Sequence, residues 1–172
     1  MSTLTPSSPT SAAALVLLAL ATAALSGCSI INGVFGGGQA TRDESGEVVE
    51  GNEQTDVFTL RVGDCGNVPE NNEVVSTLPT VPCSEPHDFE IYLSHIMSQV
   101  DYPGEDAIAA EADEVCLAAF PDFIGIPYDD SQYYFSYYYP TEGSWAGGDR
   151  EILCLVYDQA GQITGSLENI GQ

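Results

Sequence analysis

The order of hydrophobic and polar residues divides the chain into three segments. A mostly apolar run from Ala14 to Leu25 is shorter than the roughly 20 residues that a membrane-spanning helix needs, and it is typical of an export signal. Residues 29–55 lack an apolar period and are rich in Gly and acidic residues, which predicts a flexible tether. We therefore expect a signal peptide over residues 1–27, a tether over 28–55 and a folded domain over 56–172.

Short alternating segments in the third region predict strands, and one longer segment predicts a helix. The expected strands cover residues 57–62, 74–83, 88–97, 132–139 and 151–157. The helix is expected to begin after Gly104 and to end at Pro121. Residues 151–157 are almost continuously apolar, which suits a central strand covered on both faces. Strands, a helix and further strands predict an α+β domain, with a small, mostly antiparallel sheet and one packed helix.

The end of the apolar run, Leu25-Ser26-Gly27-Cys28, resembles a bacterial lipobox. We expect cleavage before Cys28 and attachment of lipid to its thiol. Two or three acyl chains, palmitate among them, would hold the protein stably on the extracytoplasmic face of the cell membrane. Residues 1–13 contain no Lys or Arg, and the alternative is an uncleaved anchor in which Cys28 is buried.

The net charge of the chain limits the classes of partner that it can bind directly. The chain has 172 residues, with 26 Asp and Glu against 3 Lys and Arg, and its formal net charge is −23. A chain with so few cations cannot neutralise phosphates, so nucleic acid is excluded as a direct partner. An anionic bilayer would also repel the domain, so the lipid must provide the attachment to the membrane.

Four cysteines remain besides Cys28, and an even number in an exported chain predicts two disulfides. Four cysteines allow three connectivities. We favour Cys65–Cys83, which would join two loop ends in the strand-rich half, and Cys116–Cys154, which would join the helix to the central strand. No Cys-x-x-Cys pair occurs, so neither a thioredoxin-like redox site nor a zinc knuckle is supported.

Several short motifs follow one another in a characteristic order. They are Val62-Gly63-Asp64-Cys65, Val81-Pro82-Cys83 with Pro86-His87 and Glu90, Cys116 with Phe120, and Trp145 with Gly148-Asp149-Arg150 and Cys154. Together, over about residues 58–157, they resemble the septum-formation family of actinobacterial envelope proteins. The resemblance implies an extracytoplasmic domain involved in cell division, without a recognised catalytic reaction.

Candidate sites are few. His87 and Glu90 could supply metal ligands, but on a strand they would point to opposite faces, so we expect no metal. We assign His87 a structural role, bonded to backbone near the Cys83 loop, and we treat Glu90 as structural too. Asp149 and Arg150 are expected mainly to hold the turn before the last strand. No cofactor is expected.

Aromatic residues provide the candidate binding surface. Tyr134, Tyr138 and Trp145, with Arg150 nearby, could form an exposed platform for a glycan or a peptide, or they could be half-buried core. The sequence therefore favours a non-catalytic, lipid-anchored envelope protein that binds a cell-division or cell-wall partner. The alternative is an envelope hydrolase that uses paired carboxylates, although no spacing selects such a pair.

Overall fold

The computed structural model describes residues 38–69 and 75–172. The predicted signal peptide and lipobox lie outside the described residues. Within the described residues, six antiparallel strands form the main sheet in the order β3-β5-β4-β6-β8-β7. Their bounds are β3 Asn52–Asp56, β4 Cys65–Gly66, β5 Thr77–Val81, β6 Phe89–Ile96, β7 Tyr134–Tyr138 and β8 Glu151–Tyr157.

The remaining elements are short, apart from one helix. Strands β1 (Thr41–Arg42) and β2 (Val48–Glu50) pair with each other. Helix α1 spans Glu105–Ile124 and α2 spans Glu142–Ala146. Two single 3₁₀ turns, η1 (Val57–Thr59) and η2 (Tyr128–Asp130), complete the fold. The predicted α+β class, with a mostly antiparallel sheet and one main helix, is confirmed.

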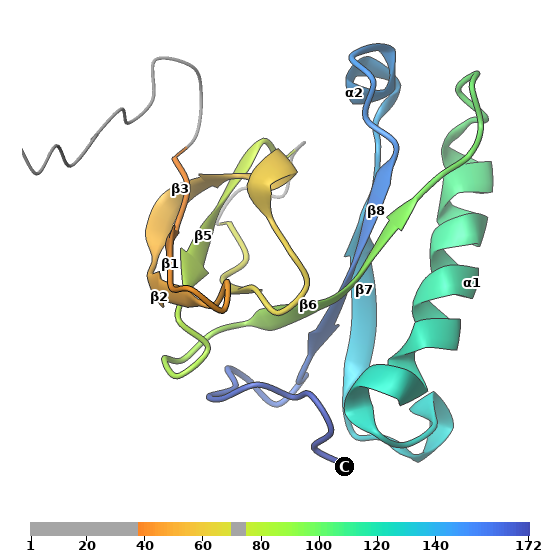
Figure 1. Cartoon of the computed structure of the whole chain (residues 1–172). Helices are drawn as coiled ribbons and strands as arrows, with labels where there is room; N and C mark the ends of the chain where they lie inside the picture. Colours follow the sequence, from red (N-terminus) through yellow and green to blue (C-terminus); the bar gives the residue numbers. More distant parts are fainter. Residues whose placement is uncertain (1–37, 70–74) are drawn as a thin grey trace, which may run out of the picture. The chain divides into compact units, whose positions relative to one another are not determined.

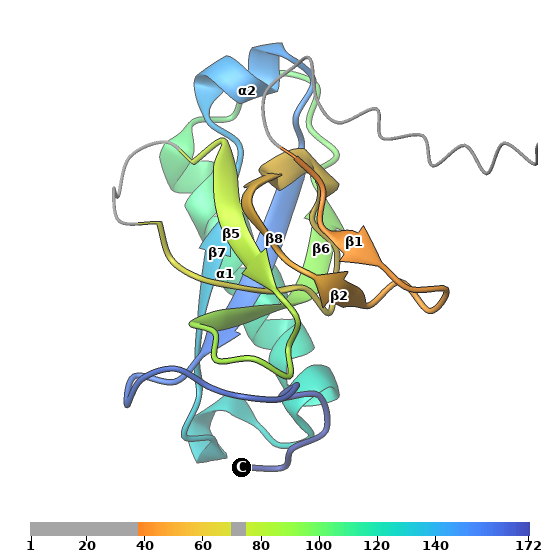
Figure 2. The same ribbon diagram turned by 90° about the vertical axis from the view of Figure 1, so that its left-hand side faces the viewer.

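Two hydrophobic clusters lie on opposite faces of β6 and β8. Helix α1 covers one face, where Ile152, Cys154 and Val156 of β8 are buried. The other face carries Leu153 and Leu155, which pack with residues of β5 and β6 and with Leu60 after η1. Figures 1 and 2 show α1 on one side of β6, β8 and β7, and β1, β2, β3 and β5 on the other. Strand β8 is therefore the buried central strand that its apolar run predicts.

Both predicted disulfides are present. Cys65 bonds to Cys83 and links the start of β4 to the loop after β5. Cys116 bonds to Cys154 and links α1 to β8. Strand β4 is only two residues long, and at Gly66 an added Cβ would lie 2.7 Å from the carbonyl oxygen of Pro79 and 2.9 Å from the Phe89 ring. Only glycine therefore fits this close approach between β5 and β6.

The strand predicted over residues 57–62 is wrong. Asp56 caps η1 by accepting a hydrogen bond from the backbone N–H of Phe58, at 3.0 Å, and this turns the chain. Of the alternating apolar residues in this segment, Leu60 is buried, whereas Phe58 and Val62 are 61% and 51% exposed. The alternation therefore belongs to an irregular segment that buries a single side chain.

The predicted tether is also wrong for residues 38–55; residues 28–37 lie outside the described residues. Strands β1, β2 and most of β3 occupy this range, and β3 is part of the main sheet. Thr55 is fully buried, and its hydroxyl lies 2.6 Å from the hydroxyl of Thr80 on β5. The folded part therefore includes residues well before the predicted boundary at residue 56.

Helix α1 continues through Pro121, where we expected it to stop. Proline removes one backbone donor from the helix, but this occurs in the last turn. Phe120 and Ile124 are both fully buried, so the last turn is stabilised by packing. The helix ends at Gly125, which has a φ of 95° and donates its N–H to the carbonyl oxygen of Pro121, at 2.9 Å.

Candidate functional site

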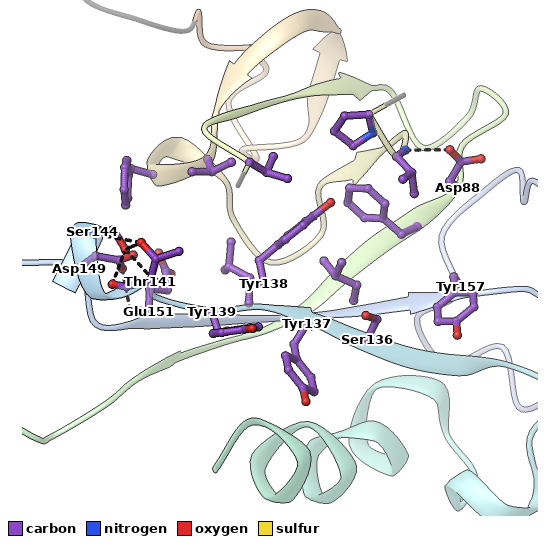
Figure 3. A pocket seen from close by; sticks show the side chains of 18 of the residues that line it. Asp88, Ser136, Tyr137, Tyr138, Tyr139, Thr141, Ser144, Asp149, Glu151 and Tyr157 are labelled. Atoms are coloured by element: carbon purple, nitrogen blue, oxygen red, sulfur yellow. Dashed lines mark hydrogen bonds between the residues drawn. The ribbon is translucent and has the colours of Figure 1, made fainter. Parts of the chain in front are cut away.

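A groove with a volume of about 810 Å³ lies mainly on the face of β7 and β8 that is opposite α1. Its floor comes from alternate residues of the two strands. Leu153 pairs with Tyr138, and Leu155 pairs with Ser136. Because side chains alternate across a strand, these four residues share one face. Figure 3 shows Tyr138 pointing into the groove and Tyr137 pointing toward α1.

The opposite wall of the groove is also apolar. It consists of Val57 and Phe58 of η1, together with Val68, Pro69 and Val75. Phe58 is 61% exposed, whereas the floor residues Leu153 and Leu155 are only 4% and 5% exposed. The groove thus offers a packed floor and an accessible aromatic ring beside it, which is an arrangement typical of sites that bind apolar ligand groups.

Acidic residues lie around this apolar surface. Asp149 and Glu151 are near the start of β8, Asp158 follows its end, and Asp88 lies just before β6. Glu105 at the start of α1 is also among the lining residues. The residues that line the described groove include no Lys or Arg. The site is therefore apolar in the middle and anionic at its margins.

Tyr138 provides a polar group on the floor. Its ring packs edge-on against Phe89, with the ring centroids 6.2 Å apart. Burial raises the pKa of the Tyr138 hydroxyl above its ordinary value of 10.0. The phenol therefore stays neutral at physiological pH and can either donate or accept a hydrogen bond. Tyr134, which we expected on the same surface, is 39% exposed and packs against Tyr157 at 6.0 Å.

Trp145 does not belong to an exposed platform, and this part of the sequence-based interpretation is wrong. Its side chain is only 4% exposed, and its indole N–H donates to the carbonyl oxygen of Val100, at 3.2 Å. Helix α2 holds it there through a capping box between Thr141 and Ser144. Tyr102 packs against the indole edge-on, at 5.7 Å. Trp145 is thus a core residue.

Arg150 is occupied by contacts within the fold. Its guanidinium lies 3.8 Å from the centre of the Trp145 ring, which is a cation–π arrangement. It also donates to the carbonyl oxygens of Gln99, Val100, Trp145 and Asp149. The Asp149 carboxylate accepts from the backbone N–H of Glu151, at 3.0 Å. Both residues therefore hold the turn before β8.

His87 and Glu90 are buried on the side of the C-terminal segment. His87 Nδ1 lies 2.8 Å from the carbonyl oxygen of Glu85, close to the Cys83 loop. Glu90 accepts hydrogen bonds from the Ser166 hydroxyl and the Leu167 N–H, both at 2.7 Å. Burial raises the pKa of Glu90 above its usual range. The Glu90 contacts attach residues 166 and 167 to β6, and the backbone of His87 exchanges hydrogen bonds with that of Ile163.

One group of potential metal ligands lies in the described residues, where Cys65, Cys83 and Glu90 place ligand atoms within 4.8 Å of one another. Both sulfur atoms are used in the disulfide, so neither is available as the thiolate that a metal would require. Glu90 alone does not make a metal site.

The groove itself was not predicted from the sequence. Because β8 is apolar at nearly every position, its sequence does not indicate that Leu153 and Leu155 face one layer while Ile152 and Cys154 face another. The Tyr-rich segment is the feature of the sequence that indicates this surface, because Tyr138 lies in the groove. Phe58 was missed because the segment around it was interpreted as a strand.

The described residues define a disulfide-bonded α+β domain with an apolar groove that has acidic margins. The chain belongs to the septum formation family, whose model matches residues 62–172. Membership indicates a role related to cell division in the envelope, and the family is not a known enzyme family. No curated protein and no solved structure matches the chain. None of the helices in residues 38–69 and 75–172 has the length and hydrophobicity required to cross a bilayer.

Proposed function

We propose that this protein is a non-catalytic, lipid-anchored envelope protein whose groove binds a cell-division or cell-wall partner. The observation that carries the proposal is the groove, in which an apolar floor formed by β7 and β8 lies beside the exposed ring of Phe58. Exposed aromatic rings next to a buried apolar surface provide much of the binding energy at protein interfaces. Family membership supports a partner that acts in cell division.

The proposed location rests on the sequence and on the disulfides. Leu25-Ser26-Gly27-Cys28 would direct cleavage and attach lipid to Cys28, which places the domain on the extracytoplasmic face of the membrane. The two disulfides are consistent with this location, because disulfides persist in oxidising compartments. Because an anionic bilayer would repel a protein with a net charge of −23, the proposed attachment to the membrane is through lipid.

The hydrolase alternative would need two carboxylates that converge on one substrate atom. Glu90 has a raised pKa, but its oxygens bind Ser166 and Leu167, and Glu90 is not among the groove residues. At the margin, the Glu151 carboxylate accepts a hydrogen bond from Ser94, and Asp149 binds the N–H of Glu151. These contacts support structural roles for the carboxylates and give no specific support for hydrolysis.

The anchor is tested by mass spectrometry of the protein extracted from membranes. Wild-type protein should begin at Cys28 and carry the mass of a diacylglyceryl group, whereas Cys28→Ala should accumulate as an unlipidated precursor. An unmodified Cys28 in the membrane-extracted wild type would overturn the lipid anchor.

The groove is tested by the location of the full chain, fused to a fluorescent protein, in dividing cells. Phe58→Ser should reduce enrichment at the division site, because it removes the most accessible apolar group of the groove. Val49→Ser is the matched control, since Val49 is 54% exposed on β2 and does not line the groove. Equal enrichment of both variants and the wild type would contradict a partner site in this groove. Turnover of a cell-wall fragment by the purified protein would instead favour the hydrolase.

A further inference from the structure

The acidic residues of the groove are arranged along its length. Asp149 and Glu151 lie near one end of β8, and Asp158 lies just beyond the other end. Between them the floor is apolar, with Leu153, Leu155 and the Tyr157 ring on the same face of the strand. A ligand that follows β8 would therefore meet negative charge at each end and apolar surface between.

The length of this floor corresponds to a short extended peptide. Glu151 and Asp158 are seven residues apart along an extended strand, which is about 23 Å at roughly 3.3 Å per residue. The floor side chains also repeat at every second residue. A polypeptide in the extended conformation has the same repeat, so its alternate side chains match the floor in spacing.

Three of the groove carboxylates are already fixed in position by the backbone. Asp149 accepts from the N–H of Glu151 at 3.0 Å, Asp158 from that of Ala160 at 2.8 Å, and Asp88 from that of Val68 at 2.8 Å. Figure 3 shows the last of these bonds. Each bond uses one carboxylate oxygen, and no side-chain partner for the second oxygen occurs among the described residues. Carboxylates fixed in this way lose little freedom when a cation binds.

We propose that the groove binds an extended segment of a partner protein, with apolar side chains on the floor and a Lys or Arg at each end. This inference rests on the proposed function and specifies its partner chemistry. Charge complementarity selects this occupant, because the lining residues of the described groove include acids and no cations. A neutral glycan would leave these carboxylates without counter-charges, and an acidic segment would be repelled.

The test uses the full chain in detergent and the labelled peptide KTVTVTVTK, whose Val and Lys side chains share one face when it is extended. Fluorescence anisotropy should show that this peptide binds at least about tenfold more tightly than ETVTVTVTE. Its affinity should fall as salt is added, because exposed ion pairs are screened. Equal binding of the two peptides, or binding of neither, would overturn the peptide proposal.

Charge-matched variants locate the binding site. Asp149→Asn combined with Asp158→Asn should weaken binding of the Lys peptide by about tenfold, since two ion pairs are lost. Asn keeps the oxygen that accepts from the backbone, and thermal melting checks that the fold is preserved. The control is Asp101→Asn combined with Asp122→Asn, which changes net charge equally at exposed residues outside the groove. Equal weakening by both pairs would show general attraction to an acidic protein and would contradict the proposal.

The cellular and the peptide experiments distinguish the groove as a partner site from the chemistry of its partner. If neither peptide binds but Phe58→Ser still loses enrichment at the division site, the groove is a partner site and the basic-segment chemistry is wrong. If the Lys peptide binds at the groove acids but Phe58→Ser keeps full enrichment, the peptide chemistry holds and the cellular role proposed above is wrong.

Discussion

Arg42 and Asp64 form a bidentate ion pair although they are 22 residues apart in the sequence. Nη2 of Arg42 lies 2.6 Å from Oδ2 of Asp64, and Nη1 contacts Oδ1. The Asp64 side chain is only 2% exposed, and Oδ2 also accepts from the backbone N–H of Arg61, at 2.8 Å. The hydrogen bond with Asp64 raises the pKa of Arg42 further above its ordinary value. This pair attaches β1 to the turn before β4.

We expect Arg42→Ala to lower the free energy of unfolding by roughly 3 kcal/mol, because it leaves the Asp64 carboxylate buried without its counter-charge. Arg61→Ala is the matched control, since it removes the same charge from an exposed residue and should change stability by less than about 0.5 kcal/mol. Urea unfolding of both variants measures the difference. Equal losses would mean that net charge, and not the ion pair, determines the effect.

Trp145 and Tyr134 should respond differently to truncation, because one is core and the other is surface. Trp145→Ala removes a buried ring, the stacking partner of Arg150 and the donor to Val100, so we expect a loss of roughly 3 kcal/mol or more. Tyr134→Ala removes a side chain that is 39% exposed and should cost about 1 kcal/mol or less. Thermal and urea unfolding provide the measurement. A fully stable Trp145→Ala variant would contradict the core assignment.

The two disulfides should differ in their accessibility to reductant. Cys116 and Cys154 are both fully buried, whereas Cys83 is partly exposed beside the buried Cys65. A dithiol added under native conditions should therefore open Cys65–Cys83 first, since thiol–disulfide exchange needs access to a sulfur atom. Alkylation and peptide mapping at increasing times give the order. Earlier labelling of Cys116 and Cys154 would contradict this prediction.

The sequence predicted the elements whose apolar pattern is set by burial. Strand β8 has the predicted bounds, because five consecutive buried residues leave little choice of period. Helix α1 begins where the acidic first turn after Gly104 indicated. The preferred disulfide connectivity was also correct, since it required only that each pair join neighbouring elements.

Other features depend on pairings between distant residues, which no local pattern contains. All five residues of β3, Asn-Glu-Gln-Thr-Asp, are polar, and the segment is a strand because it pairs with β5. The residues before β3 have the composition of a tether. What holds Arg42 in place is its ion pair with Asp64, which lies 22 residues further along the chain. The groove depends in the same way on the register between β7 and β8, which sets Tyr138 opposite Leu153.

The buried position of His87 disfavours protonation of its ring. The ring is fully buried, and Nδ1 lies 2.8 Å from the carbonyl oxygen of Glu85. A carbonyl only accepts hydrogen bonds, so Nδ1 carries the proton and Nε2 is the atom that would be protonated in acid. Nε2 is buried and has no hydrogen-bond partner among the described residues. Burial therefore lowers the pKa of His87 below its ordinary value of 6.5.

A histidine whose pKa is lowered by folding binds a proton less readily in the folded state than in the unfolded chain. It therefore costs no stability while both states are neutral at this residue. Above pH 6.5 this condition holds, and as pH falls below 6.5 the unfolded state binds a proton first. We therefore expect the stability contributed by His87 to fall by up to about 1.4 kcal/mol for each pH unit until the folded-state pKa is passed. The measurement is urea unfolding of wild type and His87→Gln between about pH 7 and pH 5. As pH falls over this range, the free energy of unfolding of the wild type should decrease relative to that of His87→Gln. An NMR titration of the His87 ring tests the same point without a variant, and a pKa at or above 6.5 would contradict the prediction.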